Sequence, residues 1–154
     1  MIEIEVQRLE VSGEVVPDMV VWEKRNGLIS YSVPGKIAER VCLAGEKASL
    51  WIEMDAGRRI VPVECHYARI TEADCDFATL PRSTGSLRLR NSPANSEVSA
   101  SLHRSGALIS IGDAVPDRLV QESGNVTFLL SGSILAGILI RTGPPCRWES
   151  QTRC

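Results

Sequence analysis

Short segments rich in β-branched and aromatic residues recur along this chain, and turn residues separate them. The first two segments, Met19–Arg25 and Leu28–Val33, flank the dipeptide Asn26-Gly27. Asn-Gly tolerates the positive φ angles of a two-residue type I′ turn better than other dipeptides. The pattern therefore predicts a β-hairpin over residues 19–33.

A second hairpin is predicted where Ala48–Met54 meets Arg59–Ile70 through Asp55-Ala56-Gly57, because apolar and polar residues alternate along the second arm. Pro62 lies in that arm and has no amide N–H to donate. We therefore expect Pro62 at a sheet edge or at a β-bulge.

A third hairpin is predicted between Asn125–Leu130 and Ile134–Arg141, joined by Ser131-Gly132-Ser133. Both arms are almost wholly apolar, which is typical of strands buried on both faces. We expect this hairpin to be central to the core.

Signals for helix are weak. Ile37–Leu43 and Val115–Val120 are each long enough for one or two helical turns only. A short strand, Leu87–Arg90, is expected between small, polar loops at 81–86 and 91–96. Gly143-Pro144-Pro145 should end the last strand, because proline cannot continue a ladder.

This spacing of strands and turns indicates an all-β fold, either a sandwich or a small barrel. We expect a small antiparallel barrel of Greek-key or up-and-down form, because closure removes the unpaired edges that such apolar strands would present.

The chain has 154 residues and a formal net charge of -2, so it provides no global attraction for nucleic acid. Its first residues alternate apolar and acidic side chains and do not form a signal peptide. The most apolar window, Thr127–Ile140, is too short and too interrupted to span a bilayer. Five cysteines at irregular spacing fit reduced thiols. We expect a cytoplasmic protein without a membrane span or a nucleic-acid partner.

No constellation of residues points to catalysis. The two histidines, His66 and His103, lack metal-ligand spacing. Cys65 and His66 are adjacent on a strand, so their side chains should point to opposite faces and cannot act together. No nucleophile elbow or phosphate-binding glycine loop is present. We expect no enzyme activity, no metal and no cofactor, and a hydrolase is the weakest alternative.

The arginines indicate a binding function more clearly than any residue indicates catalysis. Arg58 and Arg59 follow Gly57, while Arg88 and Arg90 alternate along one strand and would share a face. Guanidinium groups bind phosphate or carboxylate and stack on purines. The alternative is that they are solvated charges that keep strand edges from pairing.

The segment Ser101–Ile109 resembles a PilZ domain, whose signature D/N-x-S-x-x-G precedes a short apolar strand. Gly106 and the strand after it match, and Gly137–Arg141 is similar to the last strand of the family. Arg58-Arg59 resembles the R-x-x-x-R motif that opens such domains. The resemblance implies a barrel at residues 57–143, preceded by a β segment at 1–56 and followed by a loose tail at 144–154.

PilZ domains bind cyclic di-GMP through those arginines and through the Asp/Ser loop. By this resemblance the ligand face would be lined by Arg58, Arg59, Ser101, His103, Arg104 and Gly106. Ser101 replaces the Asp or Asn of the family, His103 replaces its Ser, and the second arginine is missing. Each lost charge-assisted hydrogen bond is worth about 1.5–3 kcal/mol, enough together to abolish micromolar binding.

Two functions remain. The first is a non-enzymatic signalling adaptor with a degenerate PilZ-like barrel, which recognises a protein partner and has cyclic di-GMP as its candidate ligand. The second is a structural subunit of a secretion, flagellar or phage-type assembly, held by strand addition and without a small-molecule ligand. The sequence leaves the oligomeric state open.

Overall fold

The computed structural model describes residues 1–7, 19–91, 93, 96–104 and 106–141. Strands make up 61% of this part of the chain. Its one helical segment is the 3-10 turn η1 (Lys24–Asn26). The fold is therefore all-β, as the sequence predicts.

The strands form three sheets. The five-stranded sheet is wholly antiparallel and has the order β2 (Met19–Glu23), β3 (Leu28–Ser32), β6 (Ile60–Tyr67), β5 (Ala48–Met54), β4 (Glu39–Ala44). The seven-stranded sheet has the order β7 (Ile70–Glu72), β10 (Val98–His103), β11 (Gly106–Ile111), β14 (Ile134–Arg141), β13 (Val126–Ser131), β12 (Arg118–Gln121), β8 (Arg82–Thr84). A small third sheet pairs β1 (Ile4–Gln7) with β9 (Ser86–Leu89).

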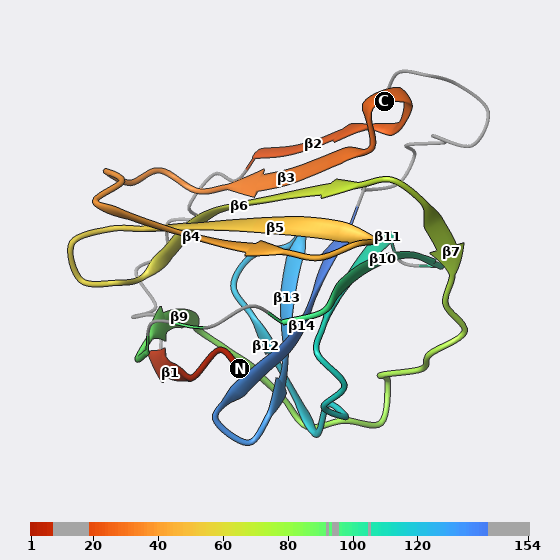
Figure 1. Ribbon diagram of the computed structural model, residues 1–154. Coiled ribbons are helices and arrows are strands. Elements are labelled where there is room, and N and C mark those ends of the chain that lie inside the picture. The colour runs from red at the N-terminus through yellow and green to blue at the C-terminus, as the bar shows by residue number, and fades with distance from the viewer. Residues whose placement is uncertain (8–18, 92, 94–95, 105, 142–154) are drawn as a thin grey trace.

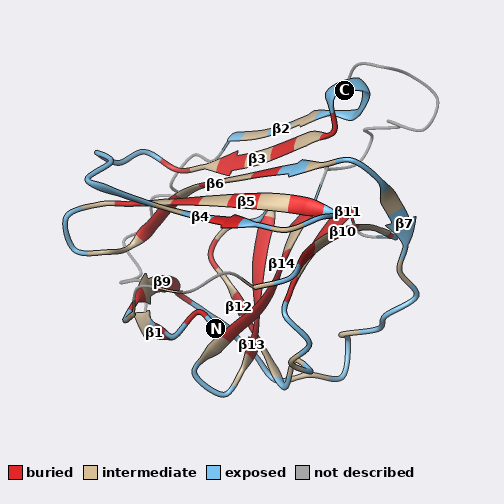
Figure 2. Ribbon diagram, viewed as in Figure 1, coloured by how far each residue is buried: buried red, intermediate tan, exposed pale blue. Residues whose placement is uncertain are grey.

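The two larger sheets pack face to face, with their strands crossing in the view of Figure 1. One continuous apolar core lies between them, and Tyr31 and Phe128 are its largest fully buried side chains. Figure 2 shows buried residues along the inward side of both layers. The small sheet joins the layers, because Arg59 bridges to Arg88 of β9 and Glu3 bridges to Ile134 of β14.

All three predicted hairpins form, but the first has a different turn. β2 and β3 are joined by η1 and Gly27, so four residues make the connection where two were expected. Gly27 has a φ of 61°, and its carbonyl accepts a hydrogen bond from the N–H of Tyr67 at 2.8 Å. A Cβ at Gly27 would collide with the carbonyl oxygen of Tyr67, so only glycine fits there.

Pro62 lies in β6, which is a central strand of its sheet and not an edge. The pairing of β5 with β6 shifts register between Ile52 and Met54, opposite Pro62. The bulge accommodates the missing N–H there. The third hairpin, β13–β14, is central to the seven-stranded sheet and largely buried, as predicted.

The expected closed antiparallel barrel is not found. Each larger sheet begins and ends on different strands within the described residues. The seven-stranded sheet is also mixed, because β7 pairs parallel to β10 and β8 parallel to β12. These two edge strands have only three residues each, and their sequences carry no signal that would distinguish them from loops.

Neither of the two segments with a weak signal for a helical turn is helical. Residues 39–43 of the first segment lie in β4, which pairs with β5, and residues 118–120 of the second lie in β12, which pairs with β13. Segments this short carry too few residues to distinguish the helical from the strand period, so ladder hydrogen bonds to a neighbour decide. The expected strand at 87–90 is present as β9.

The predicted boundary at residue 57 falls in the turn between β5 and β6, which are neighbours in one sheet. The expected tail at 144–154, with the turn that precedes it, lies outside the described residues. Among the residues that the structure describes, no helix is long and apolar enough to cross a membrane.

Candidate functional site: the arginines of the β5–β6 turn

The turn between β5 and β6 is fixed by Asp55. Its Oδ1 accepts hydrogen bonds from the N–H groups of Gly57 at 2.9 Å and Arg59 at 3.0 Å. Its carbonyl accepts a third from the N–H of Arg58 at 2.9 Å. Arg58 is thereby held at a φ of 66°, the only positive φ at a non-glycine residue in the described chain. Strained backbone of this kind persists only where neighbours enforce it.

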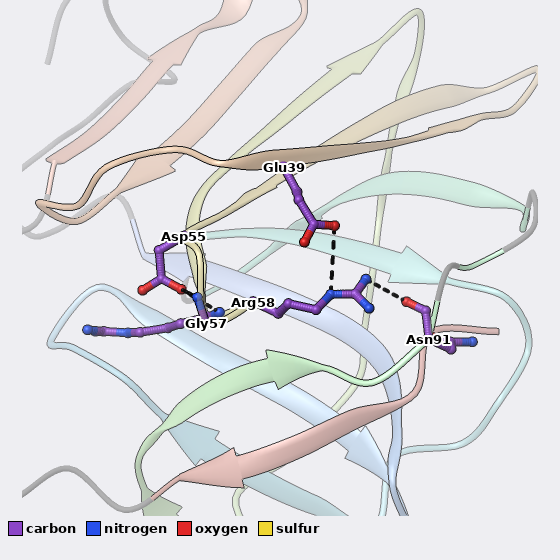
Figure 3. A network of polar contacts seen from close by, with 6 residues as sticks. Glu39, Asp55, Gly57, Arg58 and Asn91 are labelled. Carbon is purple, nitrogen blue, oxygen red and sulfur yellow. Dashed lines mark hydrogen bonds and ion pairs between the residues drawn. The ribbon is translucent and has the colours of Figure 1, made fainter.

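The Arg58 side chain points toward Asn91 in the loop after β9 (Figure 3). Its Nη2 donates to the carbonyl oxygen of Asn91 at 3.0 Å, and its Nε lies 3.8 Å from Oε2 of Glu39. Asn91 in turn accepts from the N–H of Glu3 and donates to the carbonyl of Met1, each at 2.9 Å. Arg58 therefore supports the chain segment that leads into β1.

Arg59 forms the most buried ion pair among the described residues. Its Nη2 donates to Oε1 of Glu122 at 2.8 Å, and the Glu122 side chain is 1% exposed while that of Arg59 is 28% exposed. Glu122 follows β12, so this ion pair links the seven-stranded sheet to the start of β6. A buried carboxylate needs such a partner, because its desolvation is otherwise uncompensated.

Arg88 lies beside Arg59, as its antiparallel bridge partner. Directly opposed residues of such a pair project on the same face, so the side chains of Arg59 and Arg88 leave the backbone on one face. Arg88 is half-buried and its Nε is buried without a hydrogen-bond partner. Among the described residues its side chain makes no hydrogen bond or ion pair. Arg88 is not part of the motif that resembles PilZ domains. Its alternation with Arg90 along one strand is the sequence feature that points to it.

The remaining predicted site residues lie on the β10–β11 hairpin. Ser101 Oγ is 3.4 Å from Oγ1 of Thr71. His103 is buried, stacks on Phe77 with ring centroids 5.7 Å apart, and forms a 2.7 Å hydrogen bond with the carbonyl of Cys75. Arg104 is exposed and pairs with Asp76 at 3.2 Å. These contacts hold the loop after β7 against the hairpin.

Gly106 has a backbone role in this hairpin. It pairs with His103 on one side and with Arg141 on the other, at a φ of 147°. A Cβ there would collide with the carbonyl oxygen of Ile140. Glycine is therefore required by the close approach of β14, whether or not a ligand binds nearby.

The structure does not bring the two groups of predicted residues together. Arg58 and Arg59 follow the Met54 end of β5, whereas β10 starts beside Gly45, near the opposite end of that strand. In Figure 1 the β5–β6 turn lies at the left, and β7, which pairs with β10, lies at the right. No hydrogen bond or ion pair among the described residues joins the two groups.

Other candidate chemistry is limited. Cys65 is buried and His66 is exposed on the other face of β6, as predicted. Burial raises the pKa of the Cys65 thiol to about 12, so the thiolate is disfavoured. In the described part of the chain, no three His, Cys, Asp or Glu side chains are grouped to hold a metal ion.

No protein-family model matches this sequence, and no curated protein matches it either. Functional inference therefore rests on the geometry of Arg58, Arg59 and Arg88.

Proposed function

We propose that this protein is a non-enzymatic, PilZ-like signalling adaptor that recognises a protein partner and takes cyclic di-GMP at the arginines of the β5–β6 turn. The observation that carries the proposal is the grouping of Arg58, Arg59 and Arg88 at one partly exposed site. Guanidinium forks bind phosphate oxygens in bidentate fashion and stack on purine rings, which are the two features of a cyclic dinucleotide.

The distance of the β10–β11 hairpin from this turn limits what the arginines can bind. Ser101 and His103 do not face the arginines, so the base edges of a dinucleotide would lack their partners from that loop. Binding would rest on phosphate contacts and stacking, and we expect it to weaken as salt rises. A partner protein would supply the missing contacts to the ligand, or would itself bind the arginines in place of the ligand.

A cytoplasmic setting is part of the proposal. Cys42, Cys65 and Cys75 are free thiols, which fits a reducing compartment. The adaptor would need no metal and no cofactor.

Isothermal titration with cyclic di-GMP at low salt tests the proposal, using the wild type and an Arg58→Ala/Arg59→Ala variant. We expect weak binding that the variant loses. Arg104→Ala, at the distant hairpin, serves as the matched control and should bind like the wild type. A urea unfolding curve for each variant separates lost binding from lost structure. Absence of heat at millimolar ligand with the wild type would refute the nucleotide ligand.

One observation favours the assembly subunit as a second candidate. β2 is an edge strand of the five-stranded sheet, and its side chains Met19 and Val21 are 63% and 37% exposed. An exposed apolar edge strand can pair with a strand of another chain. Light scattering of the wild type and of Val21→Lys distinguishes this candidate, because a charge on the edge should dissociate an assembly formed there.

A further inference from the structure

The three arginines of the candidate site are not equivalent. Arg58 is held by the carbonyl of Asn91 and by Glu39, and Arg59 is held by the buried carboxylate of Glu122. Moving either guanidinium onto a ligand would break these contacts. For Arg59 the move would also leave Glu122 buried without this cation, which is strongly unfavourable.

No comparable hydrogen bond or ion pair holds the Arg88 side chain in the described part of the chain. The residue is half-buried with a buried Nε, and no acidic group among the described residues lies within ion-pair distance of it. Glu5 is its cross-strand partner in the β1–β9 pair, but the carboxylate of Glu5 pairs with Arg90 at 3.6 Å. A half-buried cation without a counter-charge is costly in the free protein, so a bound anion would relieve that cost.

Gly57 lies next to the guanidinium of Arg88. Gly57 is exposed at the tip of the turn, and a Cβ at that position would lie 3.7 Å from Nη2 of Arg88 and 3.4 Å from Oδ1 of Asp55. These are ordinary contact distances, so a side chain fits at position 57 and would lie beside the Arg88 guanidinium.

We infer that Arg88 is the residue that receives a ligand phosphate group, while Arg58 and Arg59 are positioning residues that hold the turn over it. This inference rests on the proposed function, since it specifies which arginine of the same site binds the ligand. The shared ligand chemistry is a phosphate oxyanion, from a free phosphate ion or from the phosphodiester of a cyclic dinucleotide. The exposed face of the Arg88 fork would bind two of its oxygens.

The test is titration of the full chain with cyclic di-GMP and, separately, with inorganic phosphate at low salt. Arg88→Met should weaken binding about tenfold or more, because one charge-assisted contact is lost. Arg90→Met removes the same charge two residues away and should change the affinity less than about twofold. Arg88→Lys keeps the charge but not the fork, and should restore binding only in part. A response to cyclic di-GMP alone would assign the phosphodiester, and a response to both would assign phosphate in general.

Gly57→Glu gives a second test that leaves Arg88 in place. A carboxylate at position 57 would reach the Arg88 guanidinium and compete with the ligand, whereas Gly57→Gln adds the same bulk without the charge. We expect the Glu variant to lose binding and the Gln variant to retain more of it.

If Arg88→Met binds like the wild type while Arg58→Ala/Arg59→Ala loses binding, the inference is wrong and the proposed function stands. If the wild type binds neither probe, both are wrong.

Discussion

The Nη2 of Arg59 lies 2.8 Å from Oε1 of Glu122, joining residues 63 positions apart in the chain. Arg59 directly precedes β6 of the five-stranded sheet, and Glu122 directly follows β12 of the seven-stranded sheet. The ion pair is therefore a polar connection between the two layers at the margin of the apolar core. It explains why Arg59 is held in one position beside Arg88.

Removing the Arg59 cation should destabilise the fold. Arg59→Met leaves the carboxylate of Glu122 buried, and we expect the free energy of unfolding to fall by about 3 kcal/mol. Urea unfolding followed by tryptophan fluorescence measures this. Arg90→Met, which breaks the exposed ion pair with Glu5, should change stability by about 1 kcal/mol or less. The double variant Arg59→Met/Glu122→Met should regain much of the loss, and a double variant as unstable as Arg59→Met would contradict this account.

Gly106→Ala should destabilise the protein more than an alanine at either of two control glycines. Its φ of 147° and the close carbonyl of Ile140 leave no room for a Cβ. We expect a loss of at least about 3 kcal/mol in unfolding free energy. Gly112 has a φ of 66° but open space around it, so Gly112→Ala isolates the backbone strain of about 1 kcal/mol. Gly124→Ala has open space and no positive φ, and should be near neutral. Equal effects at all three positions would rule out the close approach of β14 as the cause.

Thiol reactivity should divide the described cysteines. Cys42 and Cys75 are exposed and should react with a thiol reagent at pH 8, while Cys65 should react only on unfolding. The folded pKa of Cys65, about 12, lies above its ordinary value of 9.0. Its contribution to stability is therefore complete below pH 9 and is lost as the pH rises toward 12, because the unfolded thiol ionises first. Cys65→Ala should flatten this alkaline part of the stability curve. Rapid labelling of Cys65 in the folded protein would contradict its burial.

Asn91 should determine how firmly the first residues are held. Its side chain accepts from the N–H of Glu3 and donates to the carbonyl of Met1. Asn91→Ala removes both hydrogen bonds, and we expect a loss of about 1–2 kcal/mol. Amide hydrogen exchange should accelerate at Glu3 but not at Leu50 in the core. Asn26→Ala breaks only an exposed side-chain contact with Glu23 and provides the control. Unchanged exchange at Glu3 would show that pairing with β9 alone holds this segment.

The local pattern of residues determined much of this fold. Alternation and turn residues predicted the three hairpins, because strand partners joined by a short turn are specified by nearby residues. The same reasoning placed Cys65 and His66 on opposite faces of one strand, since side chains alternate along a strand with a period of two.

Only the tertiary structure decided the rest. The pairing of Ile4–Gln7 with Ser86–Leu89 joins segments about eighty residues apart, so residues near either segment in the chain do not specify it. β4 and β12 became strands through ladder hydrogen bonds to neighbours, against a weak local signal. The short parallel strands β7 and β8 form the edges of an open sheet where a closed barrel was expected.

The candidate site, too, was predicted only in part from the sequence. The sequence singled out Arg58 and Arg59 by their position after a turn, but their separation from Ser101 and His103 depends on how the layers pack. The commitment of Arg59 to Glu122 depends on it too, because long-range contacts of this kind leave no local trace in the chain.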